Sequence, residues 1–181
     1  MNAVARGVGA AGTRVARFEF PYMRARRAEG KKKPPDRAPV LRESWLESIG
    51  EIGGKDGPGS IIIGGKSMGG RIASMVADET GVAGLVCLGY PFHPPGQPEK
   101  LRVAHLERLK TRTLIVQGER DAFGTREEVA RYPLSKAIRI LFLADGDHSF
   151  KPRASSGRTP EQNLSEAIAL VNEFLASLRS S

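Results

Sequence analysis

The amino-acid sequence predicts an α/β protein with a doubly wound, mainly parallel β-sheet. Five apolar runs of strand length, near residues 14–20, 60–64, 84–88, 113–117 and 138–143, alternate with segments of helical periodicity. This alternation is typical of β-α-β units, in which helices cover both faces of a sheet. With 181 residues, 40% of them hydrophobic, the chain is long enough for a substantial core, and we expect one domain over residues 1–181.

The first third of the chain is expected to contain a helix end, a strand, a loop and a helix. Residues 1–12 read as the end of a helix, and residues 13–20 alternate as in a strand. Residues 21–35 are basic and end in prolines, which favours a loop. A helix is expected from about Asp36 to Gly53–Gly54, because three apolar residues follow at helical spacing: Leu41, Trp45 and Ile49.

The later elements continue the alternation. Three consecutive isoleucines at 61–63 are typical of a strand buried on both faces, and the helix after them should stop at Gly81. Residues 90–98 hold four prolines, so we expect a rigid loop with no room for a large lid. Short helices are expected over residues 100–110 and 125–132. The closing helix should begin at the capping box Thr159-Pro160-Glu161-Gln162.

The turn after the isoleucine strand carries Gly65-Lys66-Ser67-Met68-Gly69, a G-x-S-x-G pattern. In a strand-turn-helix unit this is a nucleophile elbow, which holds a serine at an exposed and strained tip. We expect the flanking glycines to be needed because the neighbouring backbone leaves no room for a Cβ atom. A phosphate-binding loop is rejected, because that motif needs a glycine where this chain has Ser60. A glycine-rich turn without chemistry stays open unless the serine has partners.

The partners of a nucleophilic serine are a histidine base and a carboxylate that orients it, in the chain order serine, acid, histidine. Two apolar strands each lead into polar residues, at Gly118–Asp121 and at Ala144–His148, where open α/β sheets build their sites. His148 is the one histidine that follows Asp121, so we predict His148 as the base and Asp121 as its acid.

Three other carboxylates compete with Asp121 for the role of the acid. Glu119, Asp145 and Asp147 are alternatives for the acid, but Asp147 adjoins His148 and points elsewhere in most conformations, and Asp145 is expected to shape its turn. For the other histidines we favour non-catalytic roles: a loop residue for His93 and a helix-face residue for His105.

Three segments together resemble one known family: Gly64–Arg71, Gln117–Gly124 and Gly146–Lys151. It comprises small α/β-hydrolases, distantly similar to dienelactone hydrolases, and includes the testis-expressed and NSL-complex-subunit hydrolase-like proteins. Residues 18–23 and 34–37 share the resemblance, which extends over nearly the whole chain. It implies an α/β-hydrolase sheet and a triad of Ser67, Asp121 and His148. It implies no particular substrate.

The expected oxyanion hole is incomplete in this sequence. One donor is the backbone N–H of Met68, directly after the nucleophile, and the other normally comes from a loop after an earlier strand. The family is expected to have such a strand ahead of the helix that ends at Gly12. Its place would be in the centre of the sheet, between residues 13–20 and 61–63. We therefore expect that the chain is N-terminally truncated and lacks this strand.

Composition narrows the compartment and the partners. The single Cys87 excludes an internal disulfide and suits a reducing cytoplasm, and no apolar run is long enough to cross a membrane. The net charge of +8 is concentrated in residues 1–40, which carry ten basic and three acidic residues. Few aromatic residues interleave with these charges, so we expect a solvated surface and no nucleic-acid partner. No metal-ligand cluster or dinucleotide fingerprint is present, and we expect no cofactor.

The sequence thus supports a cytoplasmic serine hydrolase that acts on carboxylic esters or a related small acyl substrate through an acyl-enzyme. The alternative is a hydrolase-like interaction module with weak or no activity, which binds a protein partner.

Overall fold

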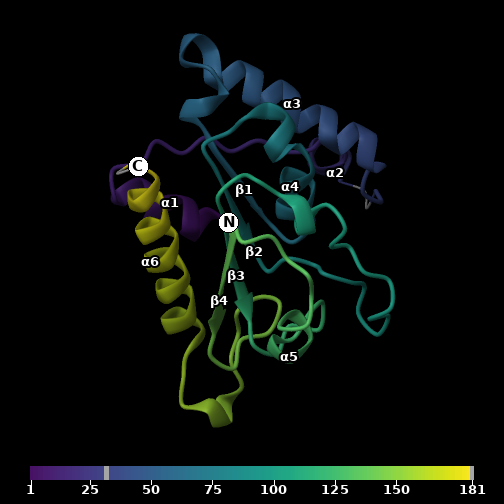
Figure 1. Cartoon of the computed structure of the whole chain (residues 1–181), viewed down its shortest axis with the longest axis vertical. Coiled ribbons are helices and arrows are strands. Elements are labelled where there is room, and N and C mark those ends of the chain that lie inside the picture. Colours follow the sequence, from purple (N-terminus) through teal and green to yellow (C-terminus); the bar gives the residue numbers. More distant parts are fainter. Residues whose placement is uncertain (31–32, 180–181) are drawn as a thin grey trace.

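The computed structural model describes residues 1–30 and 33–179. Within them, four strands form one parallel sheet in the order β1 (Ile62–Lys66), β2 (Gly84–Leu88), β3 (Thr113–Gly118) and β4 (Ile138–Leu143). Figure 1 shows the strands side by side with helices on both sides of them. The α/β class and the parallel, doubly wound sheet predicted from the sequence are confirmed.

The register of the sheet brings four loops to one edge. β1 pairs with β2 from Ile62–Gly84 to Lys66–Leu88, and β3 pairs with β4 from Thr113–Ile138 to Gly118–Leu143. Because all four strands run in the same direction, the segments that follow them start at the same edge. Open α/β sheets place their sites at this edge.

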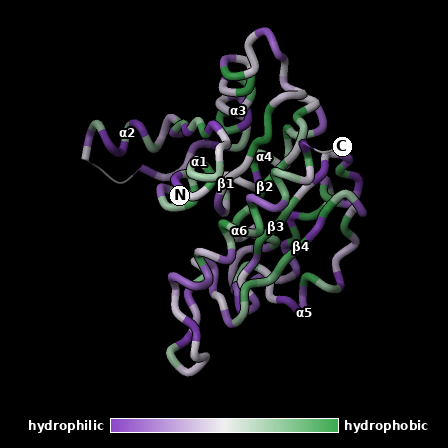
Figure 2. The backbone as a smooth tube through the Cα atoms, turned by 90° about the vertical axis from the view of Figure 1, so that its left-hand side faces the viewer, coloured by the Kyte–Doolittle hydropathy of each residue, from purple (hydrophilic) through white to green (hydrophobic). Residues whose placement is uncertain are grey.

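The strand side chains divide between two hydrophobic cores. Alternate residues of β2 and β3 (Leu85, Cys87 and Ile115) pack with α3 (Ala38–Gly53) and α4 (Met68–Thr80). The residues between them (Val86, Leu88, Leu114 and Val116) pack with α1 (Asn2–Ala10) and α6 (Pro160–Arg179). Figure 2 shows these strands as a hydrophobic centre inside more hydrophilic helices. A sheet covered on both faces explains why its strands are almost continuously apolar.

The helix boundaries agree with the local stop and start signals. α1, α3 and α4 match the expected helices, and α4 ends at Gly81 with φ of 65°. α5 (Arg126–Val129) begins with a capping box between Thr125 and Glu128. α6 begins in the same way: the backbone N–H of Thr159 donates to Gln162 Oε1 at 2.8 Å, and the N–H of Gln162 donates back to Thr159 Oγ1 at 3.2 Å. Three of the four single-turn 3-10 helices of the described residues are η1 (Gly54–Asp56), η2 (Pro58–Ser60) and η4 (Ala154–Ser156).

The strand expected over residues 13–20 is wrong. The segment pairs with no strand of the sheet, although its backbone is largely free of turns. Its alternation comes from the aromatic rings of Phe18 and Phe20, which pack beside α3; the Phe18 and Trp45 ring centroids are 4.7 Å apart. An extended segment that packs on a helix can have alternately buried and exposed side chains, as a β-strand does. The periodicity of the sequence therefore did not distinguish such a segment from a strand of the sheet.

The loop expected over residues 21–35 is also wrong in its first part. Pro21–Glu29 forms helix α2, with Pro21 in its first turn and Gly30 at its C-cap with φ of 65°. Proline suits the first turn of a helix, and alanine, arginine and glutamate are good helix formers. None of the α2 residues is buried, and Figure 2 shows α2 lying out from the strands. Lys31 and Lys32 of the expected loop lie outside the described residues.

The short helix expected over residues 100–110 is reduced to one 3-10 turn, η3 (Leu106–Arg108). Backbone N–H groups on both sides of it bond to other segments: that of Arg102 donates to the Phe92 carbonyl at 2.7 Å, and that of Lys110 donates to the Asp78 carboxylate. Buried Val103, Leu106 and Leu109 recur every third residue and anchor an irregular connection.

Within the part of the chain that the structure describes, each helix is too short or too polar to cross a lipid bilayer.

The contact of α3 with the sheet can be tested with two neighbouring residues. Leu41 is 2% exposed in the core, whereas Val40 is 45% exposed. Leu41→Ala should lower the free energy of unfolding by about 2–5 kcal/mol, since it removes buried methyl groups and leaves a cavity. Val40→Ala should change it by less than about 0.5 kcal/mol. Urea unfolding followed by circular dichroism measures both, and equal effects would contradict the packing of α3 described here.

Candidate functional site

Ser67 lies at the sharp turn between β1 and α4. Its φ of 52° and ψ of −121° are rarely adopted by a residue with a side chain, and such strain persists only where the surroundings enforce it. The backbone N–H of Ser67 donates to the Leu88 carbonyl at the end of β2 at 2.9 Å, which fixes the turn to the sheet. The serine is therefore held in place by the main chain of two strands.

Close backbone contact between β1 and α4 explains two glycines of this turn. Of the two flanking glycines of the motif, Gly65 is required by this contact, as predicted, and Gly69 is not. A Cβ atom on Gly65 would lie 2.6 Å from the Gly69 carbonyl carbon, and one on Gly70 would lie 2.6 Å from the Gly65 oxygen. A Cβ atom on Gly69 would meet nothing within 4 Å. The second glycine required by packing is thus Gly70, because Gly69 lies on the open side of the first turn of α4.

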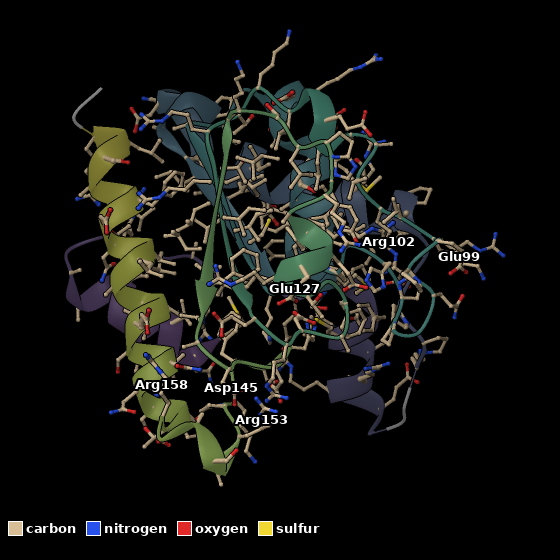
Figure 3. The ribbon with its side chains drawn as sticks, turned by 60° about the horizontal axis from the view of Figure 1, so that its bottom comes forward. Glu99, Arg102, Glu127, Asp145, Arg153 and Arg158 are labelled. Carbon is tan, nitrogen blue, oxygen red and sulfur yellow. The ribbon has the colours of Figure 1, made fainter. Side chains whose placement is uncertain are left out.

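The segment after β4 holds His148 through polar contacts on both sides. Asp145, with φ of 52°, accepts hydrogen bonds from the backbone N–H and the guanidinium of Arg153. Figure 3 shows Asp145 and Arg153 close together near the front of the molecule. Asn163, a fully buried residue of α6, donates to the carbonyls of Ala144 at 3.1 Å and Phe150 at 2.9 Å. Hydrogen bonds therefore fix the loop that carries His148 on both sides of this residue.

Asp121 follows β3 and is completely buried. Its Oδ1 accepts from the backbone N–H of Phe123 at 2.9 Å, and its Oδ2 accepts from Gln117 Nε2 at 2.9 Å. Gln117 is itself completely buried, and its amide also exchanges hydrogen bonds with the backbone of Tyr90. A buried carboxylate needs such donors, since an unpaired charge is costly inside a protein. Gln117 was missed in the sequence, although a glutamine inside an apolar strand was the available signal.

The structure brings Ser67, His148 and Asp121 into one chain of hydrogen bonds. His148 Nε2 lies 2.9 Å from Ser67 Oγ, and His148 Nδ1 lies 2.8 Å from Asp121 Oδ2. An ionised carboxylate is only an acceptor, so Nδ1 carries the proton of the neutral imidazole and Nε2 is left as an acceptor for the serine hydroxyl. Deprotonating a hydroxyl requires this tautomer.

Two further side chains support His148, and neither was found from the sequence. The Phe123 ring packs on the imidazole with centroids 4.2 Å apart. Lys66, inside the elbow motif, donates from Nζ to the His148 carbonyl at 2.5 Å, and its ammonium lies 5.0 Å from the centre of the Phe150 ring. Burial lowers the pKa of Lys66, while the nearby carboxylates of Asp121 and Asp147 act in the opposite direction.

The alternative acids have other partners. Glu119 pairs with Arg126 at 2.9 Å and accepts the backbone N–H of Asp145. Asp145 shapes its own turn through Arg153, as expected. Asp147 accepts the backbone N–H groups of residues 149 and 151.

The other two histidines and the cysteine are engaged elsewhere. His93 is buried in the proline-rich loop with Nδ1 2.8 Å from the Pro94 carbonyl oxygen, and His105 Nε2 lies 2.8 Å from Ser74 Oγ. His105 precedes η3 and so is not on the expected helix face. Burial raises the pKa of the Cys87 thiol, which leaves it a poor nucleophile.

Met68 begins α4, so its backbone N–H has no acceptor within the helix. The helix N-terminus adds positive potential beside Ser67.

Two hollows of the described surface lie away from Ser67. One is lined by α1 and Arg17, and the other by the end of α3 and Pro58. Among the described residues, no three His, Cys, Asp or Glu side chains are grouped to hold a metal ion.

The two glycines of the elbow give a matched pair of variants. Gly70→Ala should destabilise the protein by roughly 1–3 kcal/mol, since its methyl group would press on the Gly65 carbonyl. Gly69→Ala should be neutral or stabilising by up to about 1 kcal/mol, because alanine is the better helix former and the space is open. Thermal unfolding compares them, and a larger loss for Gly69→Ala would refute the assignment.

Because of the Asp145–Arg153 contact, we expect the free energy of unfolding to depend on pH in the acidic range. Its hydrogen bonds with Arg153 lower the pKa of Asp145 from 3.8 to about 2. A lowered folded-state pKa contributes stability above the unfolded value, and this contribution is lost as the pH falls from about 4 to about 2. Asp145→Asn should therefore be less stable than wild type at pH 7, and the difference should shrink below pH 4. Urea unfolding across this range measures it; a difference that stays constant down to pH 2 would count against the charge effect.

Comparison with known proteins identifies the family. The structure is similar to an alpha-beta serine hydrolase homologue from Coxiella burnetii, with a TM-score of 0.60, 17% identity, and coverage of 96% of this chain and 76% of that one. It is also similar to the esterase domain of a Rhodothermus marinus protein, with a TM-score of 0.65, 14% identity, and coverage of 96% and 78%. At these identities the likeness concerns the fold. A family model described as alpha/beta hydrolase domain matches residues 1–176, so the chain belongs to the alpha/beta hydrolase domain family.

Proposed function

We propose that this protein is a serine hydrolase that cleaves carboxylic esters, or a related small acyl substrate, through an acyl-enzyme. One observation carries the proposal: His148 lies within hydrogen-bonding distance of both Ser67 Oγ, at 2.9 Å, and the buried carboxylate of Asp121, at 2.8 Å. A serine, a base and an orienting acid in this order are the elements of nucleophilic acyl transfer.

The reaction begins with attack by Ser67 Oγ on the substrate carbonyl carbon. His148 Nε2 takes the hydroxyl proton as the bond forms, and Asp121 stabilises the resulting imidazolium through Nδ1–H. The backbone N–H of Met68 is the donor proposed for the developing oxyanion. Loss of such a donor costs about 10²–10³ in kcat in serine hydrolases.

The second half of the reaction regenerates the serine. His148 gives its proton to the leaving alcohol, and the acyl group stays on Ser67 Oγ. Water, deprotonated by His148, then attacks the acyl carbon, the bond from that carbon to Ser67 Oγ breaks, and His148 returns the proton to Oγ as the acid is released. The contacts from Lys66 and Phe123 hold the imidazole in place during both proton transfers.

The narrower parts of the proposal rest on different grounds. The motifs around Ser67, Asp121 and His148 support kinship with dienelactone-hydrolase-like proteins and with the testis-expressed and NSL-complex-subunit group. We also propose a small-molecule substrate and a cytoplasmic location, as the sequence leads us to expect. The alternative, an inactive interaction module, is not favoured, because nothing in such a role requires Gln117 and Asp121 to be buried behind His148.

The proposal predicts that a fluorophosphonate probe labels Ser67. Ser67→Ala and His148→Ala should each abolish labelling, whereas Asp121→Asn should slow it by up to about 10⁴-fold, because the imidazole would adopt the wrong tautomer. Ser149→Ala is the matched control, since Ser149 adjoins His148 and is an exposed residue. Peptide mapping by mass spectrometry identifies the labelled serine, and unchanged labelling in Ser67→Ala would falsify the assignment.

A further inference from the structure

Two half-buried arginines have no role in the reaction above. Arg71 lies on α4, four residues after Ser67, and Arg102 lies in the segment between β2 and η3. Both side chains are half-buried. Figure 3 shows Arg102 across the molecule from Arg158, with Glu127 between them in that view.

Hydrogen bonds hold the backbones of the two arginines beside one histidine. The hydroxyl of Ser74 donates to the Arg71 carbonyl at 2.7 Å, and the hydroxyl of Tyr90 donates to the Arg102 carbonyl at 2.9 Å. His105 Nε2 lies 2.8 Å from Ser74 Oγ and 3.5 Å from Tyr90 Oη. When both hydroxyls give their protons to these carbonyls, they can accept from His105 with its proton on Nε2.

This arrangement is rigid because its members are buried. Tyr90 is completely buried and Ser74 is 2% exposed. The backbone N–H of Tyr90 donates to Gln117 Oε1 at 2.7 Å, which connects the Arg102 segment to the residues that hold Asp121. The backbones of the two arginines are therefore positioned by the same buried network as the triad.

The positive charge in this cluster is not balanced by the described part of the chain. Neither the Arg71 nor the Arg102 guanidinium forms an ion pair or a side-chain hydrogen bond with another described residue. Burial, and then the charge of Arg71, lower the pKa of Arg102 and also that of His105. The backbones of Arg71 and Arg102 are both held at His105, and two like charges brought together in this way are stabilised by an anion, which guanidinium groups bind through paired N–H groups.

Arg71 connects the cluster to the nucleophile. The backbone N–H of Arg71 donates to the Ser67 carbonyl at 3.0 Å, so the two residues are one helical turn, about 6 Å, apart along α4. Long side chains on a helix lean toward its N-terminus, and for Arg71 that is the direction of Ser67. Gly89, directly before Tyr90, packs against His148: a Cβ atom on it would lie 3.3 Å from Nδ1.

We propose that Arg71 and Arg102 form an anion subsite, so that the preferred substrates of Ser67 are acyl compounds carrying a carboxylate or phosphate group near the scissile ester. This rests on the proposed function for the ester chemistry, but the binding of the anion does not depend on turnover. In this proposal, the unpaired charges of Arg71 and Arg102 select the substrate, and the triad cleaves its ester bond.

Paired esters that differ only in charge test the preference. The acyl side is probed with p-nitrophenyl hydrogen glutarate against its methyl ester, and the leaving-group side with p-acetoxybenzoate against its methyl ester. The wild-type protein should prefer the acid of at least one pair by about tenfold or more in kcat/KM, mainly through KM, after the uncatalysed rate is subtracted. The preference should fall as salt rises. Equal rates within both pairs would overturn the proposal.

Variants locate the effect. Arg71→Gln and Arg102→Gln should each remove most of the preference for the acid while the neutral ester is turned over at nearly the wild-type rate, and Arg71→Lys should keep part of it. Arg108→Gln is the control, because Arg108 is an exposed residue of η3 outside the cluster. A preference that survives in both glutamine variants would show that other residues select the anion.

Binding to an inactive variant separates this proposal from the proposed function. Ser67→Ala should bind glutarate or inorganic phosphate in calorimetric titration, and the same protein carrying Arg71→Gln should bind neither. The tighter of the two anions identifies the group for which the subsite is built. Binding without any turnover by the wild type would support the subsite and refute the hydrolase assignment, whereas turnover without binding of either anion would do the reverse.

Discussion

A carboxylate with no exposed surface must be supplied with hydrogen-bond donors, and Asp121 imposes this requirement on the whole site. Its donors are the backbone N–H of Phe123, the amide of Gln117 and the imidazole of His148. Each comes from a different part of the chain: the loop that Asp121 itself begins, the strand before it, and the loop after β4. Removing any one would leave a buried carboxylate with too few donors, so the end of β3 and the loop after β4 are fixed together.

The same requirement extends beyond the three residues of the proposed triad. Gln117 satisfies Asp121 with its nitrogen and the backbone N–H of Tyr90 with its oxygen, so one buried amide joins the acid to the segment that follows β2. On the other side, Lys66 bonds to the carbonyl of His148, so the elbow and the histidine loop meet both at Ser67 and one residue before it. A site held through these contacts depends little on the surface helices, such as α2, in which no residue is buried.

Charge is distributed unevenly between the surface and the site. Several ion pairs of the described residues join exposed arginines to acids, as in Arg27–Glu19 and Arg139–Glu173, and pairs of this kind contribute little to stability. Arg71 and Arg102 differ because they are half-buried and have no acidic partner among the described residues. Uncompensated charge beside a nucleophile costs stability, which is why a ligand is the better explanation for it than packing.

The sequence by itself determined the class of fold, the four strands that pair and the elbow. It did so because buried strands, helix stops such as Gly81 and the G-x-S-x-G turn are local patterns, each readable within a few residues. The predictions for residues 13–20 and 21–29 were wrong for the same reason. The alternating pattern of the first segment and the prolines around the second are local features, and they do not show what each segment packs against. The sequence predicted Asp121 as the partner of His148 but left Glu119, Asp145 and Asp147 as alternatives, and the contact in the tertiary structure decided between them. Only the tertiary structure showed that Gly70 and not Gly69 is confined, and that Gln117 and Lys66 contact the site. These are contacts between residues far apart in the chain or between facing backbones, and they depend on how the strands and helices pack in space.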